Sequence, residues 1–155
     1  MNDADYMSVA LEEARAAAGE GEVPVGAVLV KDGRVIARAH NRREATGNPM
    51  DHAEMIALRE GAARLGGWRL DGSTLYVTLE PCPMCAGAMV QARVARLVFG
   101  ARDLSLGAAG SRYNLVSDET ANHRLEVTDG ILEEECREIL RRFFEARRDG
   151  GKPTV

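Results

Sequence analysis

The order in which strand-like and helix-like segments follow one another constrains the fold of this 155-residue chain most strongly. Residues 25–39 contain two β-rich runs joined by Asp32-Gly33, a pair typical of tight hairpins. A strand at 73–79, a short helix and a strand at 96–100 follow. Strands that alternate with helices pair in parallel. We therefore expect an α/β fold whose mixed sheet has an N-terminal antiparallel hairpin and helices on both faces.

The remaining segments complete the order α-β-β-α-β-α-β-β-α. A first amphipathic helix ends near Gly19, and a second begins at Asp51. In residues 103–122 the apolar side chains follow neither the helical nor the strand repeat, so we predict a long loop there. A loop of this length is usually functional or disordered. Residues 123–128 are the expected last strand. The final helix is expected to bury five side chains: Leu132, Cys136, Ile139, Phe143 and Phe144.

Composition indicates one domain over residues 1–155, because 45% hydrophobic residues suffice for a core. No apolar run approaches the roughly 20 residues of a membrane span. The N-terminal residues are acidic where a signal peptide would be basic, so we expect a cytoplasmic protein without membrane association. A net charge of −4 argues against bulk nucleic-acid binding and allows a local basic patch.

Cys82 and Cys85 are the first indication of chemistry. They lie at the predicted start of a helix, where the helix dipole favours thiolates. His52 also opens a helix, and helix starts that follow parallel strands collect at one edge of a sheet. The three side chains can therefore converge on one metal ion, and mixed thiolate and imidazole ligands favour zinc.

The number of ligands separates a structural zinc, with four, from a catalytic zinc, with three and an open position. Cys136 lies on an apolar helix face, where a small buried side chain is the simpler interpretation. His40 follows the second strand of the hairpin and His123 precedes the last strand. A lone histidine in such a place is more often a surface residue or a hydrogen-bonded core residue than a metal ligand. The sequence therefore favours three ligands and a catalytic site.

Glu54, two residues after His52, has two interpretations. Asp51 and Glu54 are spaced as a helix capping box, with Asp in place of Ser or Thr. Alternatively, Glu54 is a general acid and base that reaches a water molecule at the metal. The downstream cysteine pair favours the second interpretation. A thioredoxin-like redox pair would leave His52 and Glu54 without a role, and a zinc knuckle would need a fourth ligand.

The motifs HAE (52–54) and PCPMC (81–85) resemble the signature of zinc nucleobase deaminases. Further blocks along nearly the whole chain, EVPVGAVLV, VFGARD, GAAGS and NHRLEVT among them, are similar to the bacterial tRNA-specific adenosine deaminases. The resemblance implies a three-layer α/β/α fold like that of cytidine deaminase, with five strands. It also implies hydrolytic conversion of adenosine to inosine, with release of ammonia, at the wobble position of a tRNA anticodon loop.

The resemblance assigns residue roles as well. His52, Cys82 and Cys85 would hold one zinc ion per subunit, and Glu54 would move the protons. The substrate-binding positions that it implies are Pro24, Val25, Asn41, Ala53, Pro81 and Asp103. Asp103, on its own, has the simpler interpretation of an acid that caps a loop.

The C-terminal helix is rich in arginine and is the expected RNA surface. Its candidate phosphate contacts are Arg141, Arg142, Arg147, Arg148 and Lys152, and a solvated helix face is the alternative. The family also forms homodimers, and the Ala- and Met-rich helix after Cys85 could pack against a partner.

Two features depart from the family. Met50-Asp51 precedes His52 where Thr-Ala is usual, which could add a negative charge beside the site. Residues 111–119 fall in a variable part of the family. Two other functions remain open: a deaminase of free nucleobases or nucleosides, and a zinc-binding RNA module without activity.

Overall fold

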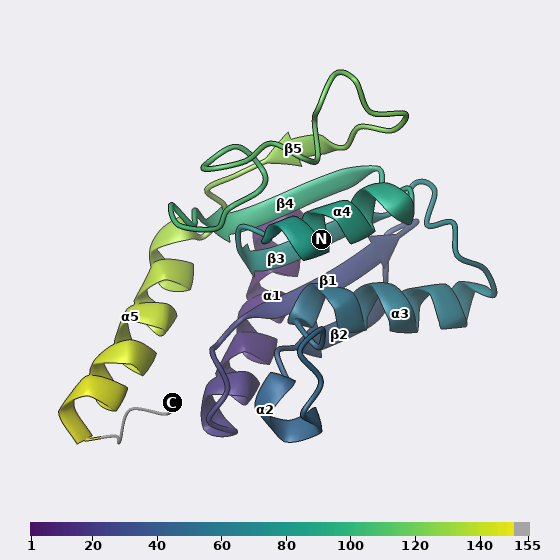
Figure 1. Cartoon of the computed structure of the whole chain (residues 1–155). Helices are drawn as coiled ribbons and strands as arrows, with labels where there is room; N and C mark the ends of the chain where they lie inside the picture. The colour runs from purple at the N-terminus through teal and green to yellow at the C-terminus, as the bar shows by residue number, and fades with distance from the viewer. Residues whose placement is uncertain (151–155) are drawn as a thin grey trace.

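A five-stranded mixed sheet with helices on both faces forms the protein, seen in a computed structural model that describes residues 1–150 (Figure 1). The strands are β1 (Gly26–Lys31), β2 (Arg34–His40), β3 (Thr74–Leu79), β4 (Arg96–Ala101) and β5 (Glu126–Thr128). The helices are α1 (Asp3–Gly19), α2 (Arg43–Thr46), α3 (Ala53–Leu65), α4 (Pro83–Gln91) and α5 (Glu133–Gly150). This is the predicted three-layer deaminase-like fold.

The strand directions bring distant loops to one edge of the sheet. The strand order is β2-β1-β3-β4-β5; β1 runs antiparallel to both of its neighbours, and β3, β4 and β5 run parallel. Consequently β2, β3 and β4 all end at the edge where β1 begins. The segments after residues 40, 79 and 101 therefore meet the segment before residue 26.

The hairpin turn follows from its two residues. Asp32 and Gly33 have φ angles of 51° and 72°, both in the left-handed region. A two-residue hairpin turn with this backbone matches the right-handed twist of its strands, and Asp-Gly is a preferred pair for it. The predicted antiparallel hairpin is confirmed.

The alternation of side chains along the strands divides the core into two layers. Leu29, Leu75 and Val77 pack with α3 and α4 on the face toward the viewer in Figure 1. Val28 and Tyr76 point the other way and pack with α1 and α5. Both layers contain fully buried side chains, as expected when helices cover both faces of a sheet.

The C-terminal part differs from expectation. β5 has three residues, fewer than predicted, and Leu132 precedes α5 with a φ of 52°. Cys136 is buried as expected, but Phe144 is 41% exposed, so the prediction of a buried Phe144 was wrong. The reason is that α5 packs on the sheet at its start, whereas Phe144 lies further along, where it lines a cavity. The short helix α2 had no sequence signal.

None of the helices in residues 1–150 combines the length and apolar character that crossing a membrane requires.

Gly26 tests how closely α1 lies on the sheet. A Cβ atom there would lie 1.9 Å from the Ala10 carbonyl oxygen and 2.7 Å from the Ala14 nitrogen. Both are backbone atoms, so the helix would have to move. We expect Gly26→Ala to lower the free energy of unfolding by roughly 1–3 kcal/mol or more in urea denaturation. Gly19→Ala, whose Cβ meets open space, is the control, and equal stability of the two variants would contradict this packing.

His40 predicts a pH dependence of stability. Burial lowers its pKa, but hydrogen bonds to Glu13 and Glu20 outweigh burial and raise the net pKa above its usual value. The stabilisation is therefore complete below about pH 6.5 and is lost as pH rises through the higher pKa of the folded state. We expect wild type to exceed His40→Gln by a few tenths to about 1 kcal/mol at pH 6, and by less at pH 9. A constant difference in unfolding free energy would refute this.

Candidate functional site

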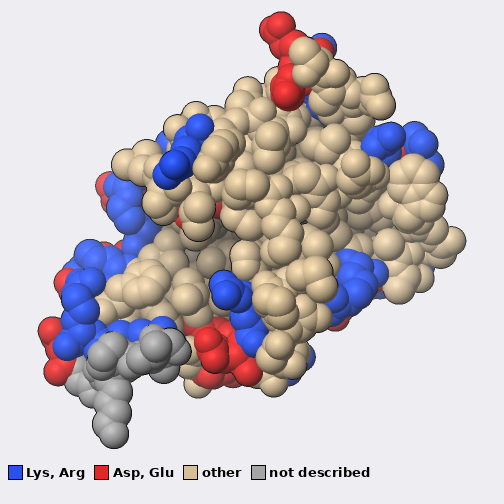
Figure 2. Space-filling view, viewed as in Figure 1, with Lys and Arg blue, Asp and Glu red and all other residues tan. Residues whose placement is uncertain are grey.

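A cavity of about 600 Å³ lies at the edge where the strands converge. Its walls come from five places: the segment before β1, the chain after β2 as far as the start of α3, the segment after β3, the loop after β4, and α5. Figure 2 shows a hollow on this face between α5, at the lower left, and the body of the molecule, with basic side chains at its border. The sheet topology thus creates the site.

His52, Cys82 and Cys85 meet on one side of this cavity. His52 is the N-cap residue of α3, Cys82 is the N-cap residue of α4, and Cys85 lies in the first turn of α4. The Nδ1 atom of His52 lies 3.6 Å from the Cys82 Sγ and 3.4 Å from the Cys85 Sγ. The three ligand atoms all lie within 4.8 Å of one another.

These distances fit a tetrahedral zinc ion. Zinc–sulfur bonds of about 2.3 Å and zinc–nitrogen bonds of about 2.0 Å at the tetrahedral angle separate sulfur from nitrogen by about 3.5 Å. The two separations lie on either side of that value. Among residues 1–150, this is the group of three or more His, Cys, Asp or Glu side chains close enough to share an ion. Three protein ligands leave a tetrahedral ion one open position.

The two thiols of this group differ in their pKa. A hydrogen bond from Cys85, and next one from His52, lower the pKa of the Cys82 thiol to about 4 despite burial. The neighbouring Cys82 sulfur and burial raise the pKa of Cys85. Without a cation, one thiolate therefore forms at the expense of the other, and a divalent cation allows both.

Glu54 lies in the same cavity and is 4% exposed. Burial is the main cause that raises the pKa of its carboxyl group to about 7, against the opposing effect of His52. A carboxyl group in this condition can accept and return a proton near neutral pH.

The capping-box interpretation of Asp51 and Glu54 was wrong. The N-cap residue of α3 is His52, and no side chain caps this helix end. Asp51 is buried and accepts a hydrogen bond from Arg59 at 3.3 Å. Its side chain is absent from the walls of the cavity, so the negative charge expected beside the metal group is neutralised elsewhere.

The structure brings together four of the six implied substrate positions. Val25, Asn41, Ala53 and Asp103 line the cavity. Pro24 and Pro81 are buried and do not line it. The Pro81 carbonyl accepts a hydrogen bond from the Ala108 nitrogen at 2.8 Å.

Asn41 is held by hydrogen bonds on both ends of its amide. Its Nδ2 donates to the Val23 carbonyl, and its Oδ1 accepts from the Arg43 nitrogen, each at 3.3 Å. The next turn is fixed by Glu22, a buried carboxylate that accepts hydrogen bonds from the Glu44 and Ala45 nitrogens. The wall formed after β2 is therefore well anchored.

Asp103 combines both of its expected interpretations. Its Oδ1 accepts hydrogen bonds from Ser105 and Leu106, as an acid that caps a loop does, and the residue also lines the cavity.

Sequence reasoning missed several residues of the walls. Leu104, Leu106, Leu140 and Phe144 give the cavity an apolar part of its lining. Glu80, 2% exposed, anchors the loop after β4. The signal for Glu80 was present in the sequence, because an acid continues the apolar strand immediately before the cysteine motif.

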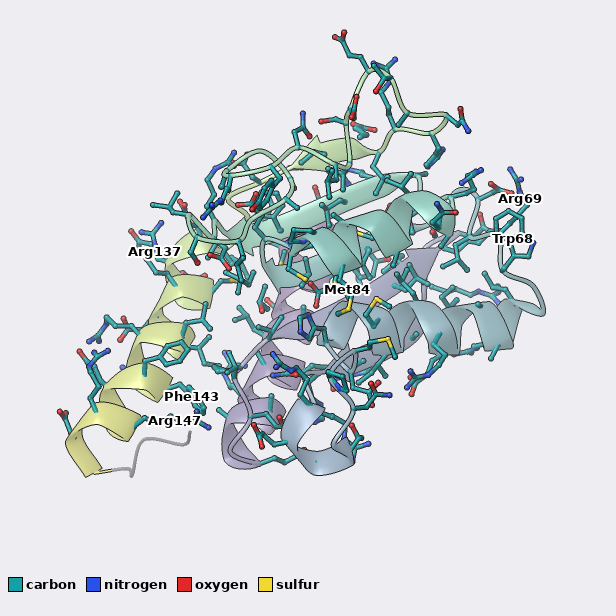
Figure 3. The ribbon with its side chains drawn as sticks, viewed as in Figure 1. Trp68, Arg69, Met84, Arg137, Phe143 and Arg147 are labelled. Atoms are coloured by element: carbon teal, nitrogen blue, oxygen red, sulfur yellow. The ribbon has the colours of Figure 1, made fainter. Side chains whose placement is uncertain are left out.

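Three of the α5 arginines proposed as phosphate contacts already have partners within the protein. Arg141 pairs with Glu138 and Glu145, and Arg142 also pairs with Glu138. Arg147 donates to the Gly21 carbonyl and lies over Phe143, with 4.4 Å between the guanidinium carbon and the ring centre (Figure 3). Arg148 is exposed, and Lys152 lies outside the described residues.

Comparisons with known proteins agree with this site. The sequence model of the MafB19-like deaminases matches residues 1–148. A tRNA-specific adenosine deaminase of Bacillus subtilis is 53% identical over 147 residues, which cover 95% of this chain and 91% of the relative. A solved structure from a study of A-to-I editing by tRNA:A34 deaminases at the wobble position has a TM-score of 0.85 and 48% identity, covering 88% and 99% of the two chains.

A more distant solved structure bears on the choice of substrate. A guanine deaminase from Nitrosomonas europaea has a TM-score of 0.79 and 26% identity, covering 90% of this chain and 83% of its own. The fold is therefore shared with an enzyme named for a free base.

The metal group makes a direct prediction about metal content. We expect the purified protein to bind one zinc ion per chain, and Cys85→Ala to lose it, because two ligands hold zinc far more weakly than three. Cys136→Ala is the matched control, since this cysteine is buried away from the site. Zinc per folded chain by elemental analysis decides, and full occupancy in Cys85→Ala would contradict the assignment.

Proposed function

The chain belongs to the tRNA-specific adenosine deaminases, and we propose that its cavity hydrolyses the wobble adenosine of a tRNA anticodon loop to inosine, with release of ammonia. The observation that carries this proposal is the meeting of Glu54 with a three-ligand metal group in one cavity. High identity over nearly the whole chain supports the RNA substrate.

Protons move through Glu54 in the proposed reaction. Its carboxylate takes a proton from the attacking water and passes it to N1 of the adenine ring, while the water oxygen bonds to C6. The second proton goes to the amino group, the C6–N bond breaks, and ammonia leaves. When bound, a zinc ion at His52, Cys82 and Cys85 supplies Lewis-acid activation of that water.

The other walls bind the nucleotide. Asn41, fixed at both ends of its amide, offers polar atoms to the nucleoside, and Val25 and Ala53 contact it from the same side of the cavity. Pro24 and Pro81, although buried, belong to the segments that carry these contacts.

An anticodon loop suits this cavity. Chemistry on a base requires that the nucleotide leave the stack, and a loop lowers that cost. The cavity extends from the metal group to Asp103, Leu104 and α5, which leaves room for nucleotides beside the target. Asp103 is placed to meet the loop backbone, and exposed Arg148 is the remaining candidate among the described α5 arginines for a phosphate contact.

Four further assignments complete the proposal. The metal is zinc, one ion per subunit. Residues 1–155 form a single zinc deaminase domain, and the protein acts in the cytoplasm on tRNA. It forms a homodimer through α4, whose half-exposed outer side includes Met84 (Figure 3) and Gly87, where an added Cβ would meet open space.

A deaminase of free bases such as guanine is the second candidate, because the guanine deaminase from Nitrosomonas europaea shares the fold. The extension of the cavity toward α5 favours RNA over a free base.

Single-turnover inosine formation on an anticodon stem-loop tests the function. We expect wild type to convert the stem-loop in preference to free adenosine, guanine and cytidine. Glu54→Gln should lower the rate by about 10²–10⁴-fold, because the amide cannot take the proton. Glu60→Gln, an exposed position on the same helix, should leave the rate unchanged.

Two results would contradict the proposal. One is undiminished inosine formation by zinc-loaded Glu54→Gln. The other is ammonia release from guanine or cytidine without inosine from the stem-loop, which would favour the free-base activity.

A further inference from the structure

Glu80 is a buried side chain just beyond the end of β3. All the hydrogen bonds that its carboxyl oxygens accept come from one segment of the chain. We call residues 102–111 the rim loop, because its first part lines the cavity. The Oε1 of Glu80 accepts from the Asp103 nitrogen at 3.1 Å and from the Ser111 hydroxyl. Its Oε2 accepts from the Ala109 and Ser111 nitrogens, each at 3.0 Å.

The rim loop closes tightly around this carboxylate. A Cβ atom on Gly107 would lie 2.4 Å from the Glu80 carboxyl carbon and 2.4 Å from the Asp103 carbonyl oxygen. The Gly107 nitrogen also donates to that Asp103 oxygen at 2.8 Å. Glycine is therefore the residue that lets the loop fold over the acid at this point.

Glu80 holds in place the part of the cavity wall that contains Asp103, the residue proposed to meet the RNA backbone. Arg102, Asp103 and Leu104 line the cavity with Ser105 and Leu106. Asp103 is bonded at both ends: its nitrogen donates to Glu80, and its side chain caps the turn at Ser105 and Leu106.

Glu80 matters as a hydrogen-bond acceptor, because all four partners donate to it. Two carboxylate oxygens can accept all four hydrogen bonds. A glutamine of the same shape would turn an NH₂ group toward two of those donors and leave at least one backbone N–H of the rim loop without an acceptor. Buried N–H groups without a partner destabilise the segment that carries them, here the rim loop.

We propose that Glu80 is a positioning residue that sets the rim loop, and with it Asp103, for binding the RNA backbone beside the target nucleotide. This role rests on the proposed function. Glu80 acts through the loop and does not touch the reacting atoms, so its loss weakens RNA binding and leaves the chemical step of bound RNA intact.

The test combines binding, rate and backbone exchange in Glu80→Gln. Binding of the stem-loop is measured in the Glu54→Gln background, where no turnover occurs, and we expect Kd to rise about tenfold, or about 1.4 kcal/mol. The single-turnover rate at saturating stem-loop, with Glu54 intact, should stay within a few-fold of wild type. Amide hydrogen exchange should quicken at Asp103, Ala109 and Ser111 and remain unchanged in the sheet.

Two further variants keep the test decisive if Glu80→Gln folds poorly. Ser111→Ala removes one donor and should give a smaller change in the same direction. Glu119→Gln, exposed in the loop beyond the rim loop, removes one negative charge and should change neither affinity nor exchange.

The outcomes that overturn the proposal are specific. Unchanged exchange at the three amides, or unchanged RNA affinity despite faster exchange, refutes a positioning role. Loss of zinc from folded Glu80→Gln also refutes it, because Glu80 would then support Cys82. If wild type neither binds the stem-loop nor forms inosine, the proposed function fails, and the RNA part of this proposal fails with it. The exchange data still decide whether Glu80 holds the loop.

Discussion

The close approach of one imidazole and two thiols is the constraint on which the site depends. His52, Cys82 and Cys85 come from two helix starts, and their donor atoms lie within 4.8 Å of one another. Without a cation these thiols compete for ionisation, and a divalent ion held by all three side chains would end that competition and link α3 to α4. Because the group offers three ligands, a tetrahedral ion bound there would have one position left for chemistry.

The sheet makes this approach possible and also builds the rest of the cavity. β2, β3 and β4 end at the edge where β1 begins, so the residues just after each of these strands lie close together there. The segment after β2 carries Asn41, the segment after β3 carries Glu80 and Cys82, and the loop after β4 carries Asp103. Buried glutamates, Glu22 and Glu80, then anchor the walls without lying at the reacting atoms.

Sequence patterns predicted what depends on local spacing. The hairpin at Asp32-Gly33, the alternating core strands and the cysteine pair at a helix start all have local signals. What depends on tertiary packing had none. Phe144 lies at the helical spacing of a core residue, yet in the structure it lines the cavity. Arg147 donates a hydrogen bond to the Gly21 carbonyl and lies over the Phe143 ring. The contact of Arg147 with Gly21 joins residues 126 positions apart, which no short pattern records.

X-ray absorption at the zinc edge of the purified enzyme shows how many ligands the protein gives the metal. We expect two sulfur ligands at about 2.3 Å, one imidazole nitrogen and one further light ligand from water at about 2.0 Å. A third sulfur or a second imidazole would show that the protein closes the fourth position. The group at His52, Cys82 and Cys85 would then be structural, and there would be no metal-bound water from which Glu54 could take a proton.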